Sequence, residues 1–88
     1  MDQKPLATVI APMDQLRFAR VQAAAAGELG QPLAGTSGDI TEHGGDIAWS
    51  YDGTVLRMDI LREFHFGPIH YHAAKIQQEL LAWVESIQ

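Results

Sequence analysis

Cysteine is absent from the sequence. Without a thiol the chain cannot form a disulfide, bind zinc through thiolates or use a cysteine nucleophile. Chains without cysteine suit the reducing cytoplasm, and the N-terminal stretch, with an acid at Asp2 and a short apolar run, is unlike a signal peptide. No stretch approaches the roughly 18–20 apolar residues of a spanning helix. These absences predict a cytoplasmic protein with no membrane partner.

Basic residues are scarce, because six Lys and Arg stand against eleven Asp and Glu, for a net charge of −5. From Asp39 to Glu63, six acids are balanced only by Arg57 and Arg62. Binding to nucleic acids depends mainly on neutralising phosphates, so this balance predicts no nucleic-acid partner. It does permit a basic protein as partner, so an acidic inhibitor or immunity-type protein is one function that stays open.

The length of 88 residues matches one small α+β domain spanning residues 1–88. A chain of this size buries only about 60–65% of the surface that its unfolded form exposes, so its own core is thin. Nevertheless, 47% of the residues are hydrophobic. This share is ordinary for a globular protein, and together with a thin core it predicts a buried interface in a homo-oligomer, in the simplest case a dimer.

The first third of the chain predicts a strand and then a helix. Residues 6–11 are apolar, partly β-branched and flanked by prolines, which favours an N-terminal strand or ordered arm within residues 1–11. Pro12 fits the first turn of a helix, and Gly30 fits the stop that follows it. The apolar stripe of this helix is Phe18, Val21, Ala25 and Leu29.

The middle of the chain has the clearest strand pattern. Apolar and polar residues alternate over residues 47–51 and 54–66, and the Asp-Gly pair between them is typical of a two-residue hairpin turn. Such a turn pairs Tyr51 with Thr54 and places the apolar residues of both strands on one face. Residues 39–43, followed by two glycines, predict one more short strand before this hairpin.

Gly67 and Pro68 end the long strand, and we predict that Pro68 opens a helix to the end of the chain. Its apolar stripe is Ile69, Ala73, Ile76, Leu80, Trp83, Val84 and Ile87. The order (β)-α-β-β-β-α predicts an α+β two-layer sandwich: an antiparallel meander of three strands, with a fourth from the N-terminal segment, and two helices on one face. Double-stranded-RNA-binding domains share the α-β-β-β-α order, but their last helix starts with basic residues, and here only Lys75 is basic.

Three of the four histidines lie in the stretch FHFGPIHYH. On a helix that starts at Pro68, His70 and His72 would point about 200° apart and could not readily share a metal ion. They could do so only if the chain stays extended to His72, because residues i and i+2 of a strand lie on one side. His65 shares its strand face with Glu63.

The simplest interpretation of these histidines is that they are surface residues. No spacing matches a zinc signature, so the sequence assigns no metal ligand, cofactor or catalytic residue. The alternative is a metal- or histidine-dependent small enzyme that uses the corner formed by Glu63, His65, His70 and His72.

Arg62 breaks the strand pattern, because it falls in the inward register between Ile60 and Phe64. A bulge or strand end near Leu61 would turn Arg62 out to solvent. Otherwise Arg62 binds a carboxylate of the protein or of a ligand, since burying an unpaired cation is prohibitively costly.

The aromatic residues are most economically core, but they could instead line a cleft that holds a small apolar ligand between sheet and helices. These residues are Trp49, Tyr51, Phe64, Phe66 and Trp83.

We therefore interpret the protein as a small binding or interaction protein rather than an enzyme. The candidate ligand-binding residues are Trp49, Tyr51, Arg62, Glu63, His65, His70 and His72. The dimer interface would involve the Ala-rich helix or the outer sheet face with Ala48, Ser50, Val55 and Leu61.

Overall fold

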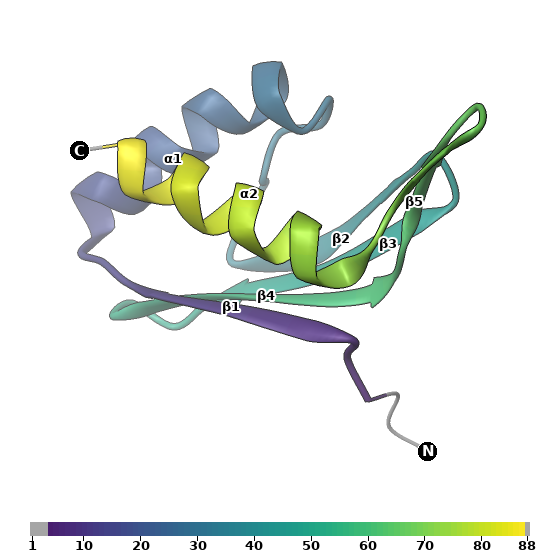
Figure 1. Cartoon of the computed structure of the whole chain (residues 1–88). Helices are drawn as coiled ribbons and strands as arrows, with labels where there is room; N and C mark the ends of the chain where they lie inside the picture. The colour runs from purple at the N-terminus through teal and green to yellow at the C-terminus, as the bar shows by residue number, and fades with distance from the viewer. Residues whose placement is uncertain (1–3, 88) are drawn as a thin grey trace.

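The computed structural model describes residues 4–87, without the side chain of Phe66. These residues form strands β1 (Ala7–Pro12), β2 (Ser37–Glu42), β3 (Gly45–Tyr51), β4 (Val55–Arg62), β5 (Phe64–Phe66) and β6 (Ile69–Tyr71), with helices α1 (Gln15–Glu28) and α2 (Ala73–Ser86). The first four strands make an antiparallel sheet in the order β1-β4-β3-β2, and β5 pairs with β6. Both helices cover one face of the sheet (Figure 1). The predicted α+β sandwich is confirmed, with β1 as its fourth strand; residues 1–3 of the expected arm lie outside the described part.

The predicted hairpin between β3 and β4 is present, but its register differs by two residues. Tyr51 pairs with Leu56 instead of Thr54. The Asp52 carboxylate accepts the N–H groups of Thr54 and Val55, each at 2.8 Å, and so closes a wider turn than the two-residue one. Because side chains alternate with a period of two, this shift leaves the same residues on the inner face.

A bulge near the end of β4 decides the orientation of Arg62. Ile47 pairs with Ile60, whereas Asp46 pairs with Arg62, so Leu61 is an extra residue on this strand. Arg62 is exposed, as the bulge interpretation predicted. A one-residue insertion exchanges the two faces of the strand, which explains why the inward pattern ends at Ile60.

Helix α1 begins three residues later than predicted. Pro12 is the last residue of β1 and pairs with Val55. Asp14 is the N-cap, and its carboxylate accepts the N–H of Arg17 at 2.9 Å. The prediction that Pro12 lies in the helix was wrong because β1 is an edge strand, where proline is tolerated.

The prediction that α2 begins at Pro68 was also wrong. Gly67, with φ of 60°, and Pro68 instead form the tip of the β5–β6 hairpin, which rises from the end of β4 on the helix side of the sheet (Figure 1). Ile69 is therefore 53% exposed instead of buried. The remaining residues of the predicted stripe are buried or packed against the core: Ala73, Ile76, Leu80, Trp83, Val84 and Ile87.

The core lies between the sheet and the two helices. Leu56, Met58 and Ile60 of β4 are fully buried beneath them, and each such side chain contributes about 1.5–3 kcal/mol. Arg17 of α1 donates to the carbonyl oxygens of Val84 (3.1 Å) and Ile87 (2.9 Å), which places a positive charge at the C-terminus of α2. These contacts tie the helices to each other as well as to the sheet.

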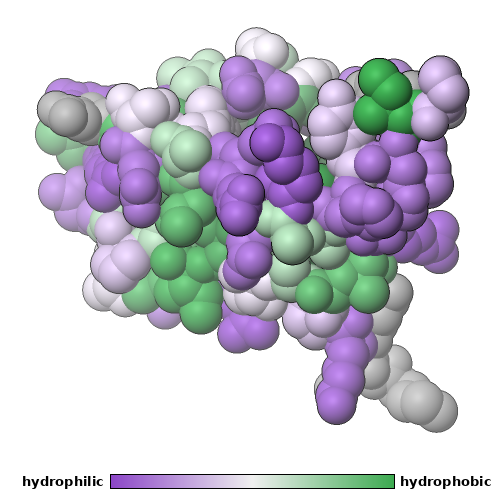
Figure 2. Space-filling view, viewed as in Figure 1, coloured by the Kyte–Doolittle hydropathy of each residue, from purple (hydrophilic) through white to green (hydrophobic). Residues whose placement is uncertain are grey.

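Among the side chains that the structure describes, the exposed large hydrophobic residues are Leu6, Ile10, Leu16, Ile69 and Leu81. Figure 2 shows an isolated hydrophobic spot over the tip of the β5–β6 hairpin, surrounded by hydrophilic side chains. Within residues 4–87, no helix has the length and apolarity that crossing a membrane requires.

Candidate functional site

The β5–β6 hairpin presents two different faces. Its register pairs Phe64 with Tyr71 and His65 with His70. Because side chains alternate along a strand, the first pair and the second pair point to opposite sides. Phe64 and Tyr71 pack against the core, and the histidine side also carries Glu63, two residues before His65.

Glu63 connects the histidine face to the start of α2. Its Oε1 lies 2.9 Å from Nε2 of His70, and its Oε2 accepts the N–H of Ala73 at 2.6 Å. His72 is the N-cap of α2 but makes no side-chain capping bond, so Glu63, between β4 and β5, supplies the cap instead. The hydrogen bond from Ala73, together with the nearby His70 and His72, holds the pKa of Glu63 below its ordinary value.

The histidine rings gather around this carboxylate. His65 stacks on His70 with ring centroids 4.4 Å apart and planes at 14°, and His70 lies 4.4 Å from His72 at 47°. Nδ1 of His72 is 3.6 Å from Oε2 of Glu63. The chain is extended to His72, which is the condition under which His70 and His72 can act together. All four predicted residues of this corner therefore meet.

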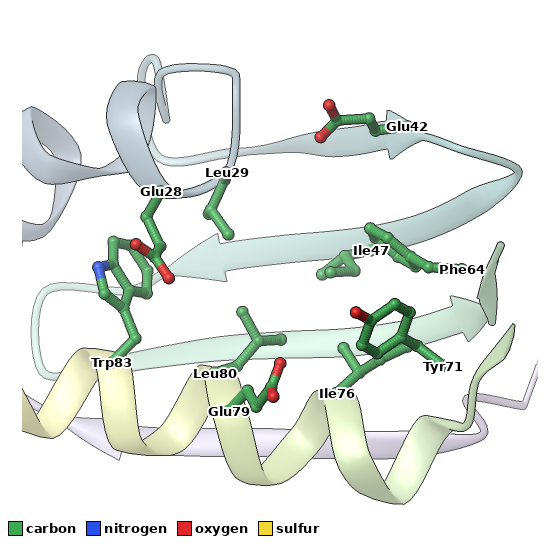
Figure 3. A pocket seen from close by; sticks show the side chains of 10 residues that line it. All are labelled: Glu28, Leu29, Glu42, Ile47, Phe64, Tyr71, Ile76, Glu79, Leu80 and Trp83. Carbon is green, nitrogen blue, oxygen red and sulfur yellow. The ribbon is translucent and has the colours of Figure 1, made fainter. Parts of the chain in front are cut away.

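On the other side of the hairpin lies a cavity of about 260 Å³ (Figure 3). It is open to solvent on one side and is bordered by α2, the end of α1, β2, β3 and the inner face of the hairpin. The residues that line it are Glu28, Leu29, Glu42, Ile47, Phe64, Tyr71, Ile76, Glu79, Leu80 and Trp83. Trp83 and Tyr71 lie towards opposite ends, and Leu80 and Ile76 point upward between them from α2 (Figure 3).

Three carboxylates give this cavity a negative field. Glu28 and Glu79 approach it from the two helices, and Glu42 lies at its far edge on β2 (Figure 3). Glu79 is 3.5 Å from Lys75, and Glu42 is 3.3 Å from His43; both pairs are well exposed, so solvent screens them. None of the ten lining residues is basic. This side of the hairpin thus has an apolar cavity with acidic walls.

The structure places three of the predicted ligand residues, Trp49, Tyr51 and Arg62, outside both the cavity and the histidine corner. Trp49 and Tyr51 are 5% and 7% exposed, and both pack against Phe18, with ring centroids 6.1 and 4.0 Å away. The Tyr51 hydroxyl lies 3.0 Å from the carbonyl oxygen of Met13 and 2.8 Å from that of Gly53, so its polar group already has partners. Burial raises the pKa of Tyr51. These two rings lie in the core under α1 and do not line the cavity, and Arg62 is outside it too.

Sequence reasoning named Phe64 and Trp83 as lining residues but missed the rest of the cavity. Tyr71 was missed because the stretch around it was assigned to a helix. The alternation of Tyr71 with the two flanking histidines was the signal that would have revealed an extended chain. Glu28 and Glu79 carry no such signal, because acids near the surface of a helix are usually solvated.

Comparisons with protein-family models, with curated proteins and with solved structures found no match. The function is therefore argued from two features of the described residues. One is the apolar cavity with acidic walls between the β5–β6 hairpin and α2. The other is the cluster of Glu63 and three histidines on the opposite face of the hairpin.

Proposed function

We propose that the protein binds a small amphipathic cation, such as an aromatic or branched aliphatic amine, in the cavity between α2 and the β5–β6 hairpin. The observation that supports this is the combination of apolar walls with three glutamates in one cavity. The proposal keeps the expectation of an apolar ligand between sheet and helices and adds a positive charge to it.

The apolar walls suit the body of such a ligand. Ile47, Ile76 and Leu80 form an aliphatic floor, and aromatic rings stand at both ends. The volume of 260 Å³ is below the roughly 300–1,000 Å³ of sites for drug-sized molecules, which favours a ligand with one ring or one branched chain. Burial of apolar ligand surface here contributes roughly 25 cal/mol per Å² before the cost of association is subtracted.

The carboxylates suit an ammonium group. Glu28 lies beside the half-buried ring of Trp83, and Glu79 lies further along α2, beyond Leu80 (Figure 3). The face of an indole ring also attracts cations. The net charge of −5 raises the local concentration of cations around the whole chain. A carboxylate ligand of the same shape would be repelled by all three glutamates.

Titration with phenethylamine tests the proposal, with phenylpropionate as a ligand of matching shape and opposite charge. Fluorescence reports on Trp83, and amide NMR shifts locate the contact. We expect saturable binding of the amine with shifts confined to the cavity, and no binding of the anion. Equal binding of both, or shifts elsewhere, would contradict the proposal.

Glutamine variants test the role of the charges. Glu79→Gln should weaken binding of phenethylamine by roughly threefold to tenfold, because it removes one carboxylate but little volume. Glu85→Gln is the matched control, since Glu85 is exposed on the same helix and does not line the cavity. An equal effect of the two variants would mean that only the net charge matters.

The homodimer expected from composition stays a prediction. Ala48, Ser50 and Val55 alternate with core residues and lie on the outer face of the sheet, together with Ile10, which is 57% exposed. A monomer mass in light scattering at micromolar concentration would contradict it.

A further inference from the structure

We propose that the outer face of the β5–β6 hairpin binds one divalent transition-metal ion of the zinc class through Glu63, His70 and His72. One ligand atom from each of these residues lies within 4.8 Å of the other two. The inference goes beyond the proposed amine site, because it concerns the opposite face of the hairpin and a different ligand.

The geometry follows from the hairpin ladder. His70 and His72 are two residues apart on an extended segment, so both side chains leave it on one side. The pairing of Phe64 with Tyr71 makes Glu63 and His72 the next positions along the ladder. Three ligand-bearing side chains from two antiparallel segments thus converge without any long loop between them.

The residue types fit zinc better than the hard cations. Imidazole nitrogen and carboxylate oxygen are ordinary zinc ligands, whereas Mg²⁺ and Ca²⁺ prefer oxygen alone. Ligand atoms around a tetrahedral zinc ion are about 3.4 Å apart, as follows from bonds of about 2.0–2.1 Å. Here Oε1 of Glu63 lies 2.9 Å from Nε2 of His70 and its Oε2 lies 3.6 Å from Nδ1 of His72, so both separations are close to that value. Three protein ligands leave a fourth position for water.

Neighbouring groups already orient two of the three ligands. The N–H of Ala73 fixes the Glu63 carboxylate at 2.6 Å, and the stacked ring of His65 supports His70 from the other side. Such supporting contacts commonly change metal affinity by about 10–100-fold when they are removed. His72, whose side chain is 74% exposed, is the ligand that is free to swing towards the ion.

The alternative is that these residues only hold the hairpin to α2. The two roles make different demands on His72. A purely structural network needs Glu63, which binds Ala73 and His70, but gains little from an exposed ring at 3.6 Å. A metal site needs the His72 nitrogen as one of three ligands. His72→Ala therefore separates the two roles, and its exposed position should leave the fold intact.

Calorimetric titration of the chelator-treated full chain with Zn²⁺ tests the proposal, and the absorption spectrum of the Co²⁺ form tests the ligand set. We expect one ion per chain, visible-range Co²⁺ bands, and a rise in melting temperature with Zn²⁺ concentration. His72→Ala should weaken Zn²⁺ binding by at least about tenfold and abolish the Co²⁺ bands. His43→Asn is the matched control, because it removes another exposed histidine. The backbone of His43 has a positive φ, which asparagine also tolerates.

Unchanged Zn²⁺ affinity in His72→Ala, or the same loss in His43→Asn, would overturn the proposal. So would the absence of saturable binding at millimolar Zn²⁺. The amine titration is independent of these results, so failure of one site leaves the other open to its own test.

Discussion

Two hairpins among the described residues, β3–β4 and β5–β6, are each held by a carboxylate, but the carboxylates act over different distances. In the β3–β4 hairpin, Asp52 accepts the N–H groups of Thr54 and Val55 within its own turn. In the β5–β6 hairpin, Glu63 accepts the N–H of Ala73, ten residues away at the start of α2. The first hairpin is specified locally, whereas the second depends on a helix and on the core.

Length reinforces this difference. Strands β3 and β4 have seven and eight residues, and β5 and β6 have three each. An isolated short hairpin is marginal in water, so β5–β6 needs its outside contacts in order to form. Both candidate binding features belong to this less independent hairpin, which makes its anchoring the first thing to test.

Gly45→Ala should have the largest effect on stability, because it disturbs the packing of β5 against β3. A methyl group at Gly45 would overlap the ring of Phe64, which packs directly on this backbone. We expect a loss of about 1–3 kcal/mol in unfolding free energy, measured by denaturant titration. Amide shifts should move in β5–β6 and leave the β3–β4 register unchanged.

Gly27→Ala is the control for Gly45→Ala. Its methyl group meets nothing within 4 Å, on a helix where alanine is favoured over glycine by about 0.5–1 kcal/mol. It should therefore stabilise the protein. Similar losses in both variants would show that β5 does not depend on Gly45.

Glu63→Ala should have the next largest effect, because it removes the cap of α2 and the contact with His70 together. Hydrogen exchange should accelerate in β5–β6 and in the first turn of α2. Asp14→Ala is the comparison, since it removes the local cap of α1 at a cost of about 1 kcal/mol. If Asp14→Ala exposed the β5–β6 amides equally, the hairpin would not be anchored through Glu63.

The contrast between the locally specified β3–β4 hairpin and the β5–β6 hairpin also explains which parts of the fold could be predicted. The β3–β4 hairpin, the edge strand β1 and the buried stripes of both helices were predictable, because alternation and helical periodicity are local patterns. The β5–β6 hairpin was missed, because its three-residue strands show only the brief alternation around Tyr71 and Pro68 also fits a helix start. The four residues of the histidine corner were named, but their meeting depended on that hairpin. The cavity was only half foreseen, because Glu28 and Glu79 come from separate helices.

A smaller effect is expected at acid pH, where Glu63 and Asp52 should each lose their stabilising contribution over a different pH range. Hydrogen bonds from backbone N–H groups lower the pKa of Glu63, through Ala73, and of Asp52, through Thr54 and then Val55. A lowered folded-state pKa stabilises the protein above the unfolded-state value and ceases to do so as the pH falls through the folded-state value. Stability should therefore fall below about pH 4.5 for Glu63 and about pH 3.8 for Asp52.

Glu63→Gln should flatten the upper part of this acid decline, and Asp52→Asn the lower part. Thermal melts at closely spaced pH values measure both slopes. A decline with the same slope in Glu63→Gln as in the parent would mean that the carboxylate is not the titrating group.

Asp52→Asn at neutral pH should have the smallest effect. The asparagine side-chain oxygen can still accept the N–H groups of Thr54 and Val55, so the local turn survives. Asp52→Ala removes that acceptor and should lower the melting temperature more. A larger loss in the asparagine variant than in the alanine variant would show that charge, not turn geometry, closes this hairpin.

The position of the β5–β6 hairpin has a thermodynamic consequence. Its six strand residues form a wall with the proposed amine site on one side and the proposed metal site on the other. Any ligand that orders this wall reduces the ordering cost left for the second ligand, so each would strengthen the other by the same factor. Measuring Zn²⁺ affinity with and without phenethylamine gives that factor. A ratio of one would mean that the wall is already rigid and that its two faces bind independently.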